Sequence, residues 1–587
     1  MKITKSIARL AVTAGLTAAL SFGGVMAPVT MAFAGGTPVA TTSGNVTIKD
    51  DDYAGTTFKG IKIFSATVTQ DQTNANVWDS TGEKTLSDIT WASNEVRDAV
   101  KSVFDGNAYA NKPKNDDAQA WAEFIKEQAG SDNVGEGAKV NADNKLNVIA
   151  AKLISTEGLV WTDLTNQQTK NLDAGYWLFV TNQPSSTKDN NKTNGNVDAF
   201  TSPIFTIVGG ADVNAEPKKS VPNVTKAVKD DADGATFGTD VFTSPNKSAD
   251  SRMDQFIEYQ LTGTVASNIN TYSTYKYIFT DKLPTSMTPE LKNDNMTPVV
   301  TVKIDDNVVK SGYESTYSGD VLTVNFTNLK ACQDENDKPI VLNDKSTVTV
   351  EYKAKLDSSK VCNSDGSLKS QFGSLLGTAQ TNTVMLTYSN NPHVVDDTGT
   401  TVDHPAYDYT YGIDVTKVGS DDEEKGLKGV EFTLQEQGDT DNFIMANGVK
   451  TIDETKAKLT TDSNGKINVV GLDEGTYVLK EVTPAPGYNN SAAGGVTFTI
   501  ASDSLPTNGN SFTPSCTLAE GTDENLVQVS SATDGRVHLT VTDKKGSNLP
   551  LTGLNGVTFT WIAGGAVLCI GVAHLIRSRK RDDGSEE

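Results

Sequence analysis

The stretch GTYVLKEVTPAPGY, Gly475–Tyr488, predicts a β-strand with an ionisable side chain on its apolar face. Residues two apart share a face of a strand, so Tyr477, Leu479 and Glu481 point the same way. An apolar face packs inward, where a lone charge is costly to bury. We therefore expect Glu481 either to reach solvent at a strand end or to have a chemical role inside the fold.

Two further strands of the same segment repeat this pattern. In GIDVTKV, Lys417 shares its face with Val415, and in RVHLTVTD, Asp543 shares its face with Val541. Each residue alone fits a solvated strand end, but three coincidences in one unit favour a buried cluster. Burial lowers the pKa of an amine and raises the pKa of a carboxyl group. A neutral amine can then attack a side-chain carbonyl that a protonated carboxyl group polarises, and the amide product removes both buried charges.

The stretch YVLKEVTPAPGY resembles the Y-x-L-x-E-x-x-A-P-x-G-Y box of the collagen-adhesin B-type domains of Gram-positive surface proteins, with a one-residue difference in spacing before the Pro-Gly-Tyr end. The resemblance implies that Lys417 is the nucleophile, Glu481 the acid and base, and Asp543 the acceptor of an intramolecular isopeptide bond. Asparagine is the commoner acceptor in that family, so an aspartate here implies the release of water instead of ammonia.

The segment upstream, from about Val221 to Asp403, contains alternating strands separated by Gly, Asp, Asn and Pro, which predicts a β-sandwich. It resembles the second domain of Actinomyces-type fimbrial shaft proteins, in which a first-strand lysine joins a last-strand asparagine. The resemblance implies a bond between Lys226 and Asn382, with Lys229 as a weaker alternative to Lys226. An acidic helper is expected before the strand FIEYQLTGTV. Asp250 and Asp254 both fit this position, and the sequence does not choose between them.

The first segment mixes strands such as TFKGIKIFSATV and GYWLFVT with three helical stretches, for which Ser93 and Asp117 are expected N-caps. The fold class is thus mainly β: tandem immunoglobulin-like, collagen-adhesin-type β-sandwiches with some helix in the first domain and a C-terminal transmembrane helix. We expect five segments: a signal peptide at 1–34, an N-terminal pilin domain at 35–215, a middle isopeptide-forming β-sandwich at 216–405, a C-terminal collagen-adhesin B-type β-sandwich at 406–546 and a cell-wall sorting signal at 547–587.

Both ends of the chain predict export. Basic residues precede an apolar stretch that ends in the small-residue site Ala32-Phe33-Ala34, typical of a signal peptide. Near the other end, an apolar run at 557–576 is long enough to cross a membrane as a helix, and a basic tail follows it. Together with the pentapeptide before it, this resembles a Gram-positive cell-wall sorting signal, which implies cleavage by a sortase between Thr552 and Gly553; a plain membrane anchor is the alternative. The pentapeptide is Leu549, Pro550, Leu551, Thr552 and Gly553.

The stretch DVNAEPKKS closes the first segment and resembles the pilin motif W-x-x-x-V-x-V-Y-P-K through Val213, Pro217 and Lys218. It departs from the motif where Gly209 replaces the Trp and Glu216 replaces the Tyr. The resemblance implies that the Lys218 amine attacks the sortase thioester, so that Thr552 of one copy is joined to Lys218 of the next. Lys219 is the alternative nucleophile, and a solvated linker lysine is the alternative reading of the motif.

Composition limits the remaining function classes. The chain has 587 residues and a formal net charge of −23, which argues against a nucleic-acid partner. Scattered histidines and the absence of a CxxC pair give no support to a metal or cofactor site. Because an exported protein meets oxidising conditions, we expect a disulfide between Cys332 and Cys362, with Cys516 unpaired.

These features predict a non-enzymatic, structural subunit of a pilus shaft at the cell wall and cell surface. Its expected partners are other copies of the chain, a class C-type pilin sortase, a housekeeping sortase and peptidoglycan, with minor pilins and host receptors left open. The alternatives are a monomeric wall-anchored adhesin, or a minor tip or base pilin, that binds a host ligand. A wall-attached enzyme would need a catalytic constellation in the first domain, and the sequence shows none.

Overall fold

The computed structural model describes residues 37–546, except 75, 80–82, 107–108, 131–139, 186–194, 503 and 532–533. The expected signal peptide, the LPLTG pentapeptide with Thr552 and the expected membrane span lie outside the described residues. Within the described part of the chain, no helix is both long enough and apolar enough to span a bilayer.

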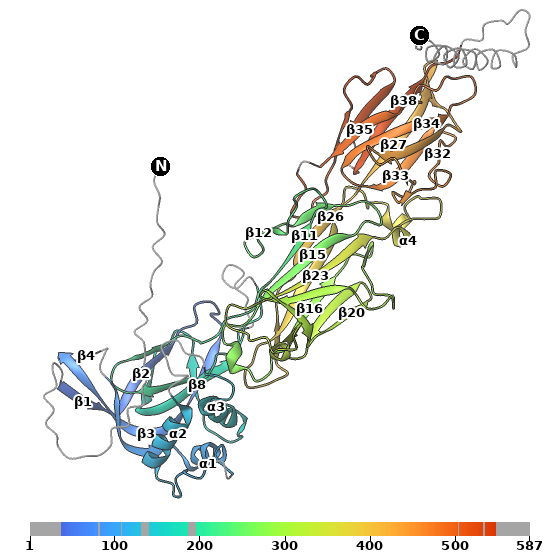
Figure 1. Cartoon of the computed structure of the whole chain (residues 1–587). Coiled ribbons are helices and arrows are strands. Elements are labelled where there is room, and N and C mark those ends of the chain that lie inside the picture. The colour runs from blue at the N-terminus through green and yellow to red at the C-terminus, as the bar shows by residue number, and fades with distance from the viewer. Residues whose placement is uncertain are drawn as a thin grey trace, which may run out of the picture.

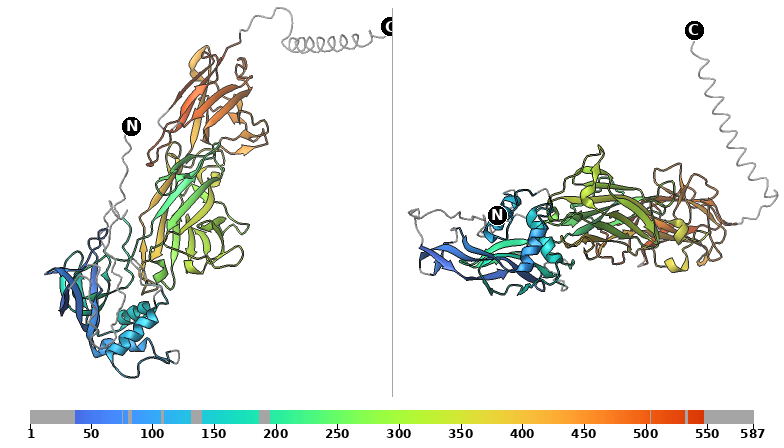
Figure 2. Two further views of the ribbon diagram at one scale, coloured as in Figure 1. Left: turned by 60° about the vertical axis from the view of Figure 1, so that its left-hand side comes forward. Right: turned by 90° about the horizontal axis from the view of Figure 1, so that it is seen from below.

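Three bodies follow one another along an elongated molecule, with the helices confined almost entirely to the first (Figure 1). The same order is visible in the two further views (Figure 2). The prediction of a mainly β chain is confirmed.

The first body is built on the long strand β3 (Thr57–Asn74), whose alternating buried residues pack against three helices. Ser93 and Asp117 cap the first two helices as predicted, because their side chains accept hydrogen bonds from backbone N–H groups of the first turn. The helices are α1 (Asn94–Ser102), α2 (Ala118–Ala129) and α3 (Lys145–Ser155). The other strands are β1 (Thr37–Thr41), β2 (Ser43–Ile48), β4 (Val77–Trp78), β5 (Thr85–Trp91), β6 (Thr162–Thr165), β7 (Lys170–Asp173), β8 (Gly175–Gln183), β9 (Ile204–Val208) and β10 (Val213–Ala215).

The middle body has two large sheets that enclose one apolar core. The first sheet has the order β11 (Val224–Lys229), β15 (Ile257–Thr264), β23 (Thr347–Leu356), β18 (Val300–Ile304), β19 (Asn307–Ser311) and β22 (Gln333–Asp334), with β17 (Met287–Pro289) on β23. The second has the order β14 (Ser248–Asp250), β26 (His404–Tyr409), β24 (Gln380–Ser389), β16 (Tyr277–Lys282), β21 (Val321–Phe326) and β20 (Glu314–Ser318), with β25 (Thr398–Thr400) on β24. Short elements complete it: β12 (Gly238–Asp240), β13 (Ser244–Pro245), α4 (Ser358–Val361) and the 3₁₀ turns Ile269–Thr271, Leu329–Ala331 and Ser370–Phe372.

The C-terminal body also has two sheets around a core of its own. Its first and last strands, β27 (Tyr411–Gly419) and β38 (Arg536–Asp543), pair in parallel, with Lys417 opposite Val541 and Gly419 opposite Asp543. The first sheet is completed by β28 (Asp422–Gly426), β33 (Lys466–Leu472) and β37 (Val527–Ser531). The second has the order β32 (Leu459–Thr460), β29 (Glu431–Glu436), β34 (Gly475–Thr483), β35 (Val496–Ala501) and β36 (Ser515–Leu518), and β30 (Phe443–Ile444) pairs with β31 (Lys450–Thr451).

The joint between the middle and C-terminal bodies is short and heavily bonded. Only Thr410 separates β26 from β27. Across the joint, the Tyr411 hydroxyl donates to Asp250 Oδ2 at 2.7 Å, and the Ser248 hydroxyl donates to the Pro506 carbonyl at 2.7 Å. The Met253 N–H donates to the Gly471 carbonyl at 2.9 Å. These bonds hold the two bodies in one orientation.

The predicted disulfide between Cys332 and Cys362 is wrong, because both are free thiols, as is Cys516. The two cysteines lie toward opposite ends of the middle body. Cys332 directly follows the 3₁₀ turn Leu329–Ala331, which is bonded to the segment around residues 269–275, and that segment contacts the first body through Ala142. Cys362 ends α4, where nearby Gly366 lies against Ala446 of the C-terminal body. Sequence spacing alone could not show this separation.

Candidate functional site

The C-terminal body buries an amine between two carboxyl groups. Lys417 Nζ lies 2.6 Å from Asp543 Oδ1 and 3.1 Å from Glu481 Oε2, and none of the three side chains is exposed. The lysine comes from β27, the aspartate from the end of β38 and the glutamate from β34 in the facing sheet. The strand alternation expected from the sequence therefore brings the three residues to one point.

Two carboxylate oxygens of this cluster are buried without a hydrogen-bond partner among the described residues. Asp543 Oδ1 also accepts from the Ser491 N–H at 3.0 Å, whereas Asp543 Oδ2 and Glu481 Oε1 are buried and have no hydrogen-bond partner among the described residues. Burial raises the pKa of Glu481 to about 7, against the opposing effect of Lys417. Near neutral pH the glutamate can thus act as an acid or as a base.

The middle body buries a second amine, Lys226 on β11. Its Nζ lies 2.5 Å from Asp281 Oδ1 and 3.0 Å from the Tyr352 hydroxyl. The same hydroxyl donates to Asp281 Oδ2 and accepts from Asn382 Nδ2 at 2.7 Å, and Asn382 Oδ1 is buried and has no partner among the described residues. Burial lowers the pKa of Lys226 to about 8 and raises the pKa of Asp281. The predicted pair, Lys226 and Asn382, therefore meets at one tyrosine hydroxyl.

The acidic group beside Lys226 is Asp281, and neither expected helper occupies that position. Asp250 belongs to the joint, where it accepts from Tyr411 of the next body. Asp254 has a positive φ of 60°, accepts from the backbone N–H and hydroxyl of Ser358, and pairs with Lys355 at 3.0 Å. Asp250 and Asp254 both precede β15, the position at which the sequence predicts the helper. Asp281 lies on β16, which follows β15.

Sequence reasoning missed Asp281 and Tyr352, although the signal was present. In YIFTDK, Asp281 shares a face with Phe279 and Tyr277, both fully buried. In TVTVEYKAKL, Tyr352 shares a face with Val348 and Val350. The alternation rule that singled out Lys417 applies equally to these strands.

The weaker alternative, Lys229, lies at the end of β11 with its side chain 38% exposed and pairs with Glu258 at 3.0 Å. It is three residues beyond Lys226, so it falls on the opposite face of the strand. This position does not bring Lys229 to Asn382.

The two candidate linkage lysines differ in their surroundings. Lys219 forms ion pairs with Asp198 and, at 2.9 Å, with Asp50, and its side chain is only 5% exposed. As whole residues Lys218 and Lys219 are both intermediate in exposure; the Lys218 backbone N–H donates to the Thr201 hydroxyl at 2.7 Å and its carbonyl accepts from the Ser202 N–H. A nucleophile must reach a separate enzyme, so the ion pairs and the burial of the Lys219 side chain count against Lys219 as the linkage residue.

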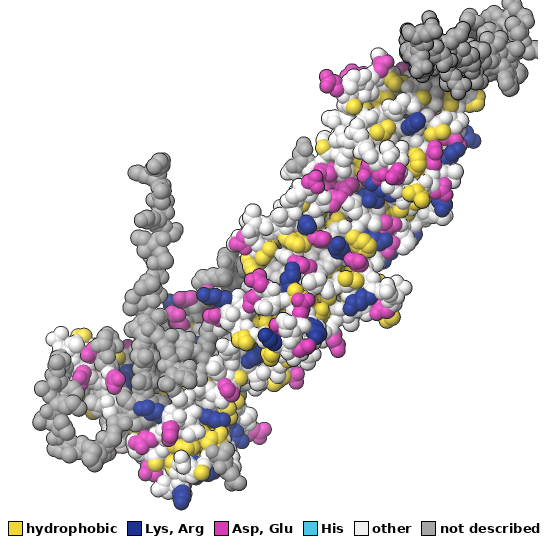
Figure 3. Space-filling view, viewed as in Figure 1, with side chains coloured by type: hydrophobic (Ala, Val, Ile, Leu, Met, Phe, Trp, Pro, Cys, Tyr) yellow, Lys and Arg dark blue, Asp and Glu magenta, His cyan; other side chains and the backbone are white. Residues whose placement is uncertain are grey.

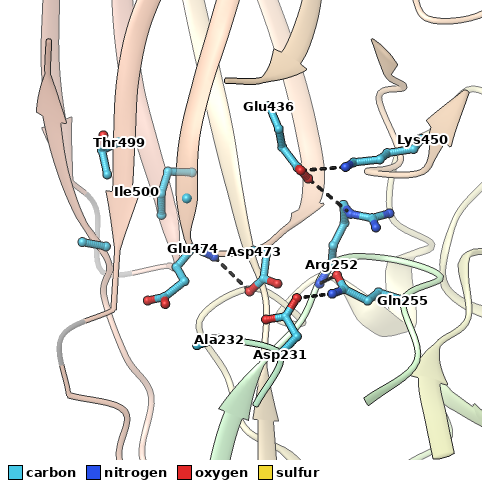
Figure 4. A pocket seen from close by; sticks show the side chains of 12 residues that line it. Asp231, Ala232, Arg252, Gln255, Glu436, Lys450, Asp473, Glu474, Thr499 and Ile500 are labelled. Carbon is cyan, nitrogen blue, oxygen red and sulfur yellow. Dashed lines mark hydrogen bonds and ion pairs between the residues drawn. The ribbon is translucent and has the colours of Figure 1, made fainter. Parts of the chain in front are cut away.

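Acidic side chains gather where the middle and C-terminal bodies meet (Figure 3). A pocket at this joint is lined by Asp231, Asp473 and Glu474, together with the ion pair between Arg252 and Glu436 (Figure 4). Carboxylate oxygens of Asp230, Asp250 and Glu474 lie within 4.8 Å of one another. Burial raises the pKa of Asp250 to about 7, and burial with the neighbouring carboxylates raises the pKa of Asp473 well above its ordinary range.

This cluster predicts a pH-dependent joint. In the folded protein the pKa of Asp250 is about 7, so Asp250 is protonated below about pH 7. In the unfolded chain its pKa is about 4, so Asp250 stays ionised until the pH falls to about 4. The free energy of unfolding of the wild type should therefore rise relative to that of Asp250→Asn as the pH falls from 7 toward 4, by up to about 1.4 kcal/mol per pH unit. Thermal or urea unfolding across this range measures the difference. Asp254→Asn is the control, and parallel profiles for wild type and Asp250→Asn would contradict the prediction.

One known family model matches most of the C-terminal body. Residues 412–514 match the family model described as "SpaA: Prealbumin-like fold domain". Among curated proteins, the serine-aspartate repeat-containing protein C of Staphylococcus aureus strain Newman is 34% identical over 203 residues, which is 32% of this chain and 20% of that protein. The chain thus spans about a fifth of the length of this relative.

Among solved structures, the chain is similar to the T6 backbone pilin of serotype M6 Streptococcus pyogenes, with 14% identity and a TM-score of 0.48 over 86% of this chain and 99% of that chain. It is also similar to SpaD, the major pilin of Corynebacterium diphtheriae, with 15% identity and a TM-score of 0.40 over 86% and 98%. The segment that matches the family model, residues 412–514, holds Lys417 and Glu481.

Proposed function

We propose that this protein is the structural subunit of a covalently polymerised pilus shaft, stiffened by intramolecular isopeptide bonds. The observation that carries the proposal is Lys417, held without exposure between Asp543 and Glu481 at 2.6 and 3.1 Å. An unreacted ion triad buried this deeply is costly to keep. Its conversion to an amide removes the charges and joins the first strand to the last.

In the C-terminal body, a proton first passes from Lys417 Nζ to Asp543, and the neutral amine then attacks Cγ of the protonated Asp543. Glu481 takes a proton from the attacking amine and gives a proton to the departing oxygen, so that one water leaves and one amide forms. The pKa of about 7 for Glu481 suits both roles.

In the middle body, Lys226 Nζ attacks Cγ of Asn382, and one ammonia leaves. Asp281 is the acidic helper, because it lies 2.5 Å from the attacking nitrogen and burial raises its pKa. This bond joins β11 in one sheet to β24 in the other.

Polymerisation needs a further lysine on the surface. Lys218 lies between β10 and β11, partly exposed, in the stretch that resembles the pilin motif. A pilin sortase cleaves between Thr552 and Gly553 and transfers Thr552 to Lys218 of the next copy, and a housekeeping sortase joins the finished polymer to peptidoglycan. A head-to-tail contact of this kind is heterologous and does not close, which yields a filament at the cell surface.

Mass spectrometry tests the internal bonds. A recombinant 35–545 segment should be lighter than its calculated mass by one ammonia plus one water. Lys226→Ala should be lighter than its own calculated mass by one water only. Lys417→Ala should be lighter than its own calculated mass by one ammonia only. Full calculated mass for the wild-type segment would refute both bonds.

A further inference from the structure

The Tyr352 hydroxyl contacts every reacting group of the middle cluster. It accepts from Lys226 Nζ at 3.0 Å and from Asn382 Nδ2 at 2.7 Å, and it donates to Asp281 Oδ2. The nucleophile, the group that must leave and the acid therefore share one oxygen atom.

The tyrosine is held rigidly in this place. Its backbone pairs with Tyr259 on β15 and with Val300 on β18, so it belongs to a central strand of the first sheet. The Tyr352 ring stacks on the Tyr259 ring with centroids 5.4 Å apart, and Lys226 Nζ lies 5.3 Å from the Tyr352 ring centroid. The side chain spans from this sheet to Asp281 and Asn382 in the facing sheet.

We propose that Tyr352 is a catalytic residue of the Lys226–Asn382 bond and donates the proton with which the asparagine nitrogen leaves as ammonia. This inference rests on the proposed crosslink in the middle body. Because an amide nitrogen departs readily only after it is protonated, the reaction needs a donor at Nδ2, and Tyr352 is within hydrogen-bond distance of that atom.

The proton balance closes within the cluster. Lys226 Nζ forms a bond to Cγ of Asn382, and the electrons of the C=O double bond move to Oδ1. Nδ2 then loses its amide conjugation and gains a lone pair. In the reactive state Lys226 is a neutral amine and Asp281 carries a proton on Oδ2, so that Oδ2–H donates to the Tyr352 oxygen and the Tyr352 O–H turns toward Nδ2. The attacking nitrogen passes a proton to Asp281 Oδ1, Asp281 Oδ2 passes its proton to the Tyr352 oxygen, and the Tyr352 O–H proton moves to Nδ2 as the C–N bond breaks. The products are one amide and one ammonia, and Asp281 and Tyr352 return to their starting states.

The electrostatics fit a relay of this kind. Burial, together with Asp281, raises the pKa of Tyr352 well above its ordinary range, so the hydroxyl stays protonated and gives up its proton only while it receives another. Asp281 presents one oxygen to the amine and the other to the hydroxyl.

The C-terminal cluster offers an internal contrast. Its acceptor is an aspartate, so an oxygen leaves instead of a nitrogen. Among the described residues, the aromatic ring near Lys417 is Phe432, at 5.8 Å, which has no hydroxyl group. A tyrosine hydroxyl thus accompanies the cluster that must release ammonia.

Tyr352→Phe tests the proposal, because it removes the hydroxyl and keeps the ring. The full chain is synthesised in a cell-free system, and samples are quenched in acid over time. Peptide mapping then gives the fraction in which the Lys226 and Asn382 peptides are joined. The rate of joining should fall about 100-fold or more. Tyr277→Phe is the matched control, since Tyr277 is a buried tyrosine on the same strand as Asp281 but its hydroxyl donates to the Thr264 carbonyl; its rate should equal that of wild type.

A second experiment distinguishes a structural role of the Tyr352 hydroxyl from a catalytic one: Lys226→Ala is added to the wild type and to Tyr352→Phe. These proteins cannot form the bond, so equal melting temperatures with and without Tyr352→Phe show that the fold tolerates the change. Wild-type joining in Tyr352→Phe would overturn the role of Tyr352 and leave the crosslink standing. No joining in wild type itself would overturn the crosslink and the tyrosine's role together.

Discussion

Replacing Lys218 by Ala should abolish the polymer. In cells that carry the matching sortase, wild-type protein is expected to give a ladder of high-mass species on a denaturing gel, and Lys218→Ala only the monomer. The reason is chemical: the sortase thioester needs an amine, and the lysine next in sequence, Lys219, is held by Asp198 and Asp50 with its side chain 5% exposed. The effect should therefore be all or none.

The matched control is Lys229→Ala, which removes a lysine whose side chain is 38% exposed from the adjoining strand β11 and should leave the ladder intact. The branched peptide that joins Thr552 to Lys218 should be recovered from wild-type polymer by mass spectrometry. A full ladder from Lys218→Ala would reject this lysine as the linkage and would point to another lysine. No ladder from the wild type itself would favour the monomeric wall-anchored adhesin.

Replacing Lys417 by Met should cause the largest loss of stability. The expected bond closes a loop that includes nearly the whole C-terminal body, and a cross-link over such a loop is worth about 5 kcal/mol. The substitution also leaves Glu481 and Asp543 buried without a cation, which adds to the loss. Calorimetry should show the C-terminal transition lowered by roughly 15 °C.

Lys480→Met is the control for this change, because Lys480 adjoins Glu481 on β34 but is exposed. It should retain the wild-type melting temperature and the mass deficit of one water. Glu481→Gln keeps the side-chain volume and should lose that deficit, which links the stability to the bond itself. Equal melting temperatures for wild type and Lys417→Met would contradict a cross-link here.

The strand pattern of the sequence was sufficient to predict that Lys417, Glu481 and Asp543 lie on inward faces, because side-chain direction alternates strictly along a strand. It did not predict which strands face one another. Asp281 reaches Lys226 from the opposite sheet, and Asp250 turns to a residue of the next body, Tyr411. Such pairings depend on sheet order and on the packing between bodies, which no local pattern records.

The same limit explains the cysteines. The 30-residue spacing of Cys332 and Cys362 agrees with a disulfide in a strand-rich exported protein, but the chain between them crosses the middle body from one end to the other. Helix caps, in contrast, depend on residues within one turn, and Ser93 and Asp117 were predicted correctly.

The position of Lys218 after the first body and before β11 has a mechanical consequence. In a filament joined through this lysine, a pulling force would pass from Lys218 through the middle and C-terminal bodies to the linkage at Thr552. The first body, which precedes Lys218, would therefore carry none of this force. The first body could then unfold locally, gain insertions or change its surface without altering how far the fibre extends under load.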